Sequence, residues 1–175
     1  TFRARDIREI INYRDVIGFI SGNRQRIITI SLITEIHKIL GFKLLPENEL
    51  GVFRTKRAVI VNSRTGDVVF DATEPGSIED EINNLIEWDK TDALDVHSLL
   101  KAGIIHYEFV RIHPFVDLNG RSARTLATWS LYRDEYDINR FFALEEHYDQ
   151  NLKLYYEAID SANNGDMTEW LEYFV

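Results

Sequence analysis

The chain has 175 residues, of which 29 are acidic and 20 are basic, and its formal net charge is −9. This balance argues against general nucleic-acid binding, because binding by phosphate neutralisation calls for a basic surface. The sequence has no cysteine, which excludes disulfides, thiolate catalysis and zinc–thiolate sites and favours a cytoplasmic protein. No apolar run is long enough for a membrane span and no signal segment opens the chain, so we expect no membrane association.

The length suits a single globular domain, and 45% hydrophobic residues are enough for a sizeable core. Residues 3–20 repeat apolar side chains at helical spacing, from Ile7 to Ile20, and predict an amphipathic helix. We expect residues 1–28 to hold an N-terminal helix that precedes a single globular core over residues 29–175.

The next segments predict a helix, a hairpin and a further helix. Residues 29–40 have helical periodicity and end at Gly41, a residue type common at helix C-caps. Residues 57–70 hold two short runs rich in β-branched residues around a turn-rich centre, which is typical of a β-hairpin. A serine and three acidic residues then favour a helix over 77–88.

Helical periodicity dominates the second half of the chain. It predicts helices over about residues 96–112, 121–136, 148–162 and 167–174. Together with the earlier elements, these make about seven helices and one hairpin. We therefore expect a mainly α fold, a compact multi-helix domain with a small β-hairpin.

One twelve-residue segment, His113–Arg124, has the sequence HPFVDLNGRSAR and carries the chemistry of the chain. Because a residue before proline avoids the helical region, the incoming helix should end just before His113. The outgoing helix should begin at about Arg121, after the turn signal Asn119-Gly120. Its free N–H groups and its dipole make that helix start a ready anion site.

The charged side chains of this segment suit phosphate chemistry. Arg121 and Arg124 are three residues apart and hence share one helix face. Cations at a helix N-terminus oppose the macrodipole, so two arginines there favour an anion bound between them. Asp117 offers a hard oxygen ligand for a magnesium ion shared with phosphates, and the neutral imidazole of His113 can accept a hydroxyl proton.

The segment resembles the signature of the Fic family, His-x-Phe-x-(Asp/Glu)-Gly-Asn-Gly-Arg-x-x-Arg, at every defined position except Leu118. The likeness extends to residues 106–112 (HYEFVRI), to residues 51–54 (GVFR) with the hairpin, and to the C-terminal residues 155–166. It covers about residues 29–174. The resemblance implies the Fic fold, in which the hairpin is a flap.

The resemblance also implies a protein adenylyltransferase, which transfers AMP from ATP-Mg²⁺ to a Ser, Thr or Tyr hydroxyl of a target protein and releases pyrophosphate. His113 would be the general base, and Asp117 would bind Mg²⁺. The phosphate oxygens would be held by Asn119, Gly120, Arg121 and Arg124, the last of them on the γ-phosphate.

An adenine site and a target site are further implications of the resemblance. Tyr156 and Asn163 would border the adenine. The flap hairpin at about 57–70 would pair with an extended target segment as an added strand and place its hydroxyl near His113. The sequence leaves open whether the chain forms a homodimer.

Two departures from the family pattern bear on activity. Leu118 stands where the family has glycine; if the loop needs a positive φ there, leucine costs about 1 kcal/mol or more and its side chain can crowd the phosphates. Many relatives also carry an inhibitory Ser/Thr-x-x-x-Glu-Gly/Asn helix, whose glutamate competes for the second arginine. No segment fits that pattern, so we infer that the switch is upstream of Thr1 or absent.

Two rival functions stay open on the sequence. The first is a transferase of the same fold with other chemistry: phosphorylation, UMP transfer or removal of AMP. The second is a catalytically weak module that binds target peptides through the hairpin, for which Leu118 is the best argument. The full set of His113, Asp117, Arg121 and Arg124 argues against the second.

Overall fold

The computed structural model describes residues 4–61, 68–136 and 151–175. In this part of the chain the regular elements are α1 (Ala4–Gly22), α2 (Ile30–Gly41), β1 (Val59–Val61), β2 (Val68–Asp71), α3 (Ile78–Lys90), α4 (Ser98–Ile112), α5 (Asn119–Arg133), α7 (Leu152–Ala162) and α8 (Thr168–Phe174). The mainly α class predicted from the sequence is thus confirmed. The middle of the predicted hairpin, 62–67, and the start of the predicted helix at 148–150 lie outside the described residues.

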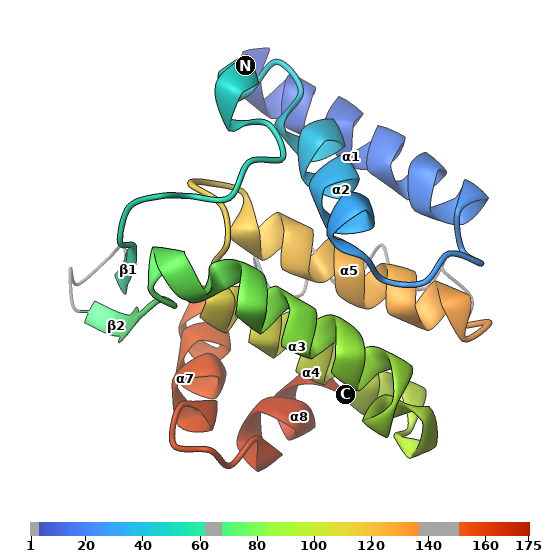
Figure 1. The fold of residues 1–175 in the computed structure, drawn as a ribbon, viewed down its shortest axis with the longest axis vertical. Helices are drawn as coiled ribbons and strands as arrows, with labels where there is room; N and C mark the ends of the chain where they lie inside the picture. The colour runs from blue at the N-terminus through green and yellow to red at the C-terminus, as the bar shows by residue number, and fades with distance from the viewer. Residues whose placement is uncertain (1–3, 62–67, 137–150) are drawn as a thin grey trace.

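Helices α4 and α5 form the centre of the molecule and pack against each other along their length (Figure 1). Helices α1 and α2 pack on α5, whereas α3 and α8 pack on α4 and α7 packs on α8. The fully buried large side chains Phe109 of α4, Trp129 of α5 and Trp170 of α8 fill the space between these helices. Because α5 is buried on most sides, its N-terminus is held at a fixed place in the fold.

The buried side of α1 is narrower than the sequence predicts. Its buried residues are Asn12, Val16 and Ile20, which are four apart and make one line along the helix. Ile7 and Ile10 lie off this line and are 50% and 61% exposed. The predicted apolar stripe is therefore wrong for the first turns of α1, because only one line of the helix packs on α2 and α5.

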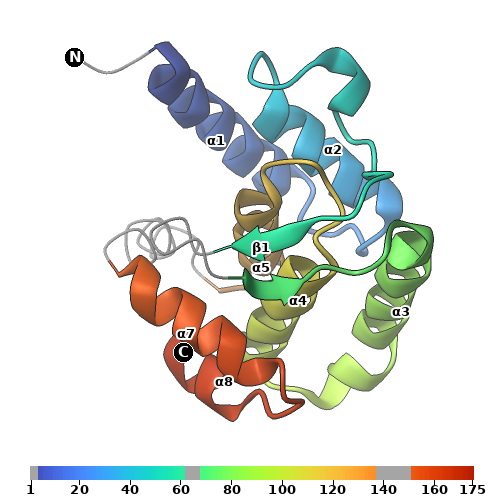
Figure 2. The ribbon, with the colours of Figure 1, turned by 90° about the vertical axis from the view of Figure 1, so that its left-hand side faces the viewer.

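Each predicted β run forms a strand, and β1 and β2 pair antiparallel with Val59 opposite Asp71. An irregularity between Ile60 and Val61 interrupts the register. The strands lie to one side of the helices, as the two perpendicular views in Figures 1 and 2 show. The two strands contain three and four residues, and so short a hairpin is not stable by itself. Its position therefore depends on contacts with the helices.

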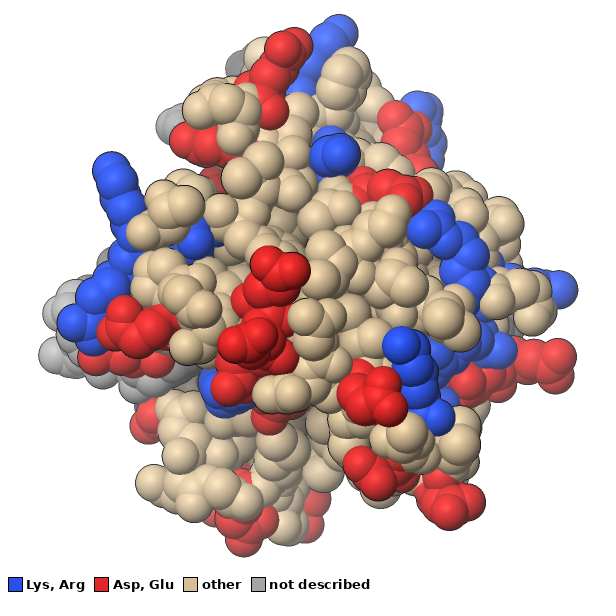
Figure 3. Space-filling view, viewed as in Figure 1, with Lys and Arg blue, Asp and Glu red and all other residues tan. Residues whose placement is uncertain are grey.

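Surface charge is mixed on the face shown in Figure 3, where Lys and Arg side chains alternate with Asp and Glu side chains. Among the helices of the described ranges, none has the length and apolar character needed to cross a membrane.

Candidate active site

The loop between α4 and α5 is bounded by two left-handed residues. His113 caps the C-terminus of α4 with φ 52°, and its N–H donates to Phe109 O at 3.0 Å. Leu118 precedes α5 with φ 63°. A left-handed residue turns the chain sharply away from a helix axis, so the two together bring the end of α4 and the start of α5 to the same place.

Hydrogen bonds of its own side chains close this loop. The Asn119 carboxamide accepts from Phe115 N–H at 2.9 Å and donates to Phe115 O at 2.8 Å, and Asn119 is only 3% exposed. Asp117 Oδ1 accepts from Leu118 N–H at 2.7 Å. Because the Asn119 side chain is taken up by Phe115, a phosphate contact of Asn119 would use its backbone N–H.

His37 of α2 holds the loop from the core side, a role that sequence reasoning missed. Its ring stacks on Phe115 at a centroid distance of 3.7 Å. Nδ1 accepts from Gly51 N–H at 2.9 Å, so the proton is on Nε2, which donates to Asp117 O at 3.2 Å. Burial lowers the pKa of His37, which keeps this neutral form. A lone histidine on an apolar helix gives no sequence signal for such a role.

Arg54, which lies just before β1, holds the end of α4. Its guanidinium donates to His113 O at 2.7 Å and to Ile112 O at 3.3 Å, and also reaches the carbonyls of Lys56 and Thr73. Arg54 is 5% exposed. The sequence marked Arg54 only through the family resemblance, and its partners became visible in the structure alone.

Leu118 has the positive φ that the family glycine suggested. Its side chain is 6% exposed and belongs to the hydrophobic core. The strain considered from the sequence is therefore present. Leu118 also lines a cavity at the start of α5, so crowding of a bound phosphate stays a prediction. The buried side chain offsets the strain by its contacts with the core.

Six of the predicted site residues line one cavity of about 280 Å³ at the start of α5. The cavity wall consists of Arg5, His113, Val116, Asp117, Leu118, Asn119, Gly120, Arg121 and Arg124. Neither Tyr156 nor Asn163 is among the described residues that line it. Asn163 accepts from the Tyr107 hydroxyl at 3.0 Å, and Tyr156 packs edge-on against Tyr155 at 5.4 Å. Their contact with an adenine stays a prediction.

His113 is a neutral imidazole at pH 7 in this cavity. Burial, aided by the nearby charge of Arg54, lowers its pKa to about 4. Nδ1 lies 3.4 Å from Val110 O, an acceptor, and this contact assigns the proton to Nδ1. Nε2 is then the unprotonated nitrogen and can accept a proton from a bound group.

Charged side chains of α1 also reach the cavity. Glu9 Oε2 accepts from Arg121 Nη2 at 2.9 Å, and Glu9 Oε1 accepts from Arg5 Nε at 3.0 Å. Arg5 Nη2 in turn lies 3.7 Å from Asp117 Oδ2. No residue pattern predicts these contacts, because Arg5 and Glu9 precede the motif by more than a hundred residues and only the fold brings them there.

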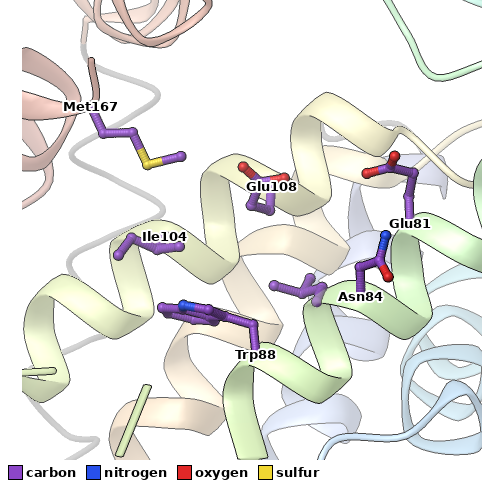
Figure 4. A pocket seen from close by; sticks show the side chains of 7 residues that line it. Glu81, Asn84, Trp88, Ile104, Glu108 and Met167 are labelled. Carbon is purple, nitrogen blue, oxygen red and sulfur yellow. The ribbon is translucent and has the colours of Figure 1, made fainter. Parts of the chain in front are cut away.

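A second cavity, of about 400 Å³, lies between α3 and α4 (Figure 4). Carbon atoms of Leu85, Trp88, Ile104 and Met167 make most of its wall. Its two carboxylates, Glu81 and Glu108, both accept from Arg111, at 2.6 and 2.8 Å. This cavity holds none of the predicted site residues.

One cavity of this helical domain thus brings together a helix start, two arginines, a carboxylate and a neutral imidazole. Such an arrangement suits a phosphate group beside a proton acceptor. The comparisons with known proteins agree with this interpretation. The chain belongs to the Fic/DOC family, whose sequence model matches residues 27–131.

Two similar proteins are both named protein adenylyltransferase Fic. The one from Nematostella vectensis is 29% identical over 172 residues, covering 94% of this chain and 36% of the relative. The one from Aedes aegypti is 29% identical over 184 residues, covering 99% of this chain and 34% of the relative. The chain thus spans about a third of the length of these relatives.

Solved structures share the fold. Fic-1 (residues 134–508) from Caenorhabditis elegans matches with a TM-score of 0.77 at 22% identity, over 99% of this chain and 48% of that chain. A Fic family protein from Desulfovibrio desulfuricans G20 matches with a TM-score of 0.80 at 24% identity, over 99% of this chain and 51% of that chain. The predicted Fic fold is thereby confirmed.

Proposed function

We propose that this chain transfers AMP from ATP to a Ser, Thr or Tyr hydroxyl of a target protein. The observation that carries the proposal is the single cavity shared by His113, Asp117 and the start of α5 with its two arginines. The names of the relatives, protein adenylyltransferase Fic, support the same chemistry.

In this reaction the target hydroxyl attacks the α-phosphorus and its proton passes to Nε2 of His113. The bond from the α-phosphorus to the bridging oxygen breaks, and pyrophosphate leaves. Backbone N–H groups at the start of α5 stabilise the charge on the phosphate oxygens, because the first turn of a helix has N–H groups without intrahelical partners. Arg121 and Arg124 hold the remaining phosphates in line.

The pKa of His113 determines the protonation state of its ring in the free protein and in the nucleotide complex. At a pKa of about 4 the ring is neutral in the free protein and able to accept a proton, but it is a weak base. The negative phosphates of a bound nucleotide raise this pKa, since an anion nearby favours the charged imidazolium. Nucleotide binding therefore makes His113 a better base where it is needed.

Asp117 is the residue that would hold a magnesium ion. Its side chain is 53% exposed, and its Oδ2 is near only the exposed Arg5 among the contacts described above. The described residues contain no group of three or more His, Cys, Asp or Glu side chains that could hold a metal. The proposal for Asp117 rests on its exposed carboxylate in the cavity, because Mg²⁺ is commonly bound by one or two carboxylates together with substrate phosphates. When bound, the ion would neutralise phosphate charge.

The target would reach His113 along the segment before β1. A cavity of about 540 Å³ is lined by residues 48–49 and 52–58 together with Val116. Val116 also lines the cavity of His113, so the two cavities adjoin at the motif loop. An extended target segment that pairs with the β1–β2 sheet would pass here, with its hydroxyl directed toward His113.

Parallel incubations with ATP labelled on the α- or the γ-phosphate, Mg²⁺ and a cell lysate test the reaction. The α-label should stay on protein, and His113→Ala should lower its transfer by about 10²–10⁴-fold, the usual contribution of a general base. Retention of the γ-label alone would instead establish a kinase. Transfer of neither label by a protein that binds ATP would favour the peptide-binding module.

Val59→Pro tests the target path, because proline removes a backbone N–H from an exposed strand of the sheet. We expect it to abolish labelling of lysate proteins while ATP binding is unchanged. Undiminished labelling would show that the target does not pair with this sheet.

A further inference from the structure

We propose that Glu9 is a positioning residue for the phosphate-binding Arg121, and that the first turns of α1 are therefore part of the nucleotide site. This inference rests on the proposed function. It starts from four side chains whose charges alternate in sign: Asp117, Arg5, Glu9 and Arg121. The chain of contacts runs from the candidate metal ligand to the first arginine of the motif.

Glu9 divides its two oxygens between two guanidinium groups. Oε1 is 3.0 Å from Arg5 Nε, and Oε2 is 2.9 Å from Arg121 Nη2. The second bond uses one of the five N–H donors of Arg121, and Arg121 lines the cavity. Within the described part of the chain the other donors of Arg121 make no further hydrogen bond, so they can meet a bound phosphate while Glu9 holds the guanidinium in one orientation.

The helix that presents Glu9 is fixed to the core. Asn12 donates to Leu40 O and to Phe42 O, both at 2.8 Å, and thereby ties α1 to the end of α2. Val16 and Ile20 are fully buried one and two turns further on. Glu9 therefore cannot leave Arg121 without breaking these contacts or adopting another rotamer.

The ion pair is worth more as an orienting device than as a source of stability. The side chains of Arg121 and Glu9 are 33% and 22% exposed, and pairs in such settings stabilise a fold by about 1 kcal/mol or less. Arg121 sits in the first turn of α5, where a cation opposes the helix dipole, and the Glu9 carboxylate offsets that repulsion. A guanidinium held in place before the phosphate arrives loses less rotamer entropy on binding.

The opposite role, a carboxylate that competes with phosphate for Arg121, predicts the opposite effect of mutation. The test measures the affinity of the chain for α,β-methylene-ATP with Mg²⁺ by titration calorimetry, because the α–β bond of this analogue does not break. We expect Glu9→Ala to weaken binding by about tenfold and Glu9→Gln, which keeps one acceptor oxygen, by about threefold.

Two controls make the result specific. Asp15→Ala removes an exposed carboxylate of the same helix that pairs with Arg14, and it should leave the affinity unchanged. In an Arg121→Ala background, Glu9→Ala should change the affinity by less than about twofold, because its effect passes through Arg121. If Glu9→Ala does not fold, the affinity of Glu9→Gln is compared with that of the wild type instead.

Tighter binding by Glu9→Ala would overturn the proposal in favour of competition, and an undiminished effect in the Arg121→Ala background would overturn the role of Arg121. Unchanged affinity in both Glu9 variants would also overturn it. A wild-type chain that binds the analogue but transfers no AMP from ATP would contradict the proposed function, and the affinities would still decide the role of Glu9.

Discussion

Two cavities border α4, one at its C-terminal end and one along its side. The first, of about 280 Å³, is lined by His113, Asp117 and the start of α5, whereas the second, of about 400 Å³, is lined mainly by carbon atoms of α3 and α4. The two carboxylates of the second, Glu81 and Glu108, are labelled in Figure 4, and both pair with Arg111. The carboxylates of the larger of these two cavities are thus both paired with one arginine. The smaller one combines the free N–H groups of a helix start with Arg121 and Arg124, and Arg121 pairs there with Glu9 of α1.

The largest expected difference concerns the arginine that supports each cavity. Arg54 holds the end of α4 beside the first cavity, and Arg111 pairs with the carboxylates of the second. Arg54→Ala leaves the buried carbonyls of Ile112 and His113 without their donor, so we expect a loss of about 3 kcal/mol or more in the free energy of unfolding. AMP transfer should fall as well, because His113 loses its support. Arg111→Ala removes two partly exposed ion pairs and should cost about 1 kcal/mol without affecting transfer.

Urea unfolding and α-label transfer on both variants check this contrast. Arg54→Lys is the matched variant, since it keeps the charge but lacks the planar fork that reaches several carbonyls. Equal stability of Arg54→Ala and the wild type would contradict the assigned role of Arg54.

The second expected effect is a loss of stability as the pH decreases below about 6.5. Burial lowers the pKa values of His37, of His113 to about 4 and of His106 to about 3, whereas the unfolded values lie near 6.5. The unfolded chain therefore binds more protons below pH 6.5, so the stability is fully present above that pH and decreases as the pH falls toward 4. Three protons give a slope of at most about 4 kcal/mol per pH unit.

Urea unfolding between pH 7 and pH 4.5 measures this slope. Carboxylates with lowered pKa values, such as Glu35 at about 2, lose their contribution only below their unfolded value of 4.5. His37→Gln does not titrate and should lower the slope by about 1.4 kcal/mol per pH unit. A slope that His37→Gln leaves unchanged would show that His37 is not held neutral.

The smallest expected effect is at Leu118, on the wall that belongs to both the polar cavity and the core. Leu118→Gly relieves left-handed strain of about 1–2 kcal/mol. It also removes a buried leucine, and truncation of a buried leucine costs about 2–5 kcal/mol. Burial outweighs strain, so we expect a net loss of about 1–3 kcal/mol with little change in AMP transfer. A more stable glycine variant in thermal or urea unfolding would reverse this balance.

Much of the fold was predictable because its signals are local. The helical periodicities of residues 29–40 and 96–112 correspond to α2 and α4 within two residues at each end, and the two β runs pair as expected. The first turns of α1 were predicted less well. Apolar residues at Ile7 and Ile10 have the spacing of a buried stripe, but burial depends on which neighbour covers them, and none does in the described structure.

The sequence by itself determined the chemical content of the site. An imidazole, a carboxylate, two arginines and a helix start fall within one twelve-residue segment, so their proximity follows from chain connectivity. Only the tertiary structure decided what holds them. His37, Arg54 and Glu9 come from segments 59 to 112 residues away in the chain, and their partners are backbone carbonyls or single oxygens that no residue pattern encodes. The tertiary structure also decided the conformation of Leu118. Its φ depends on how α4 and α5 are joined, and the place of its side chain depends on the core into which it packs.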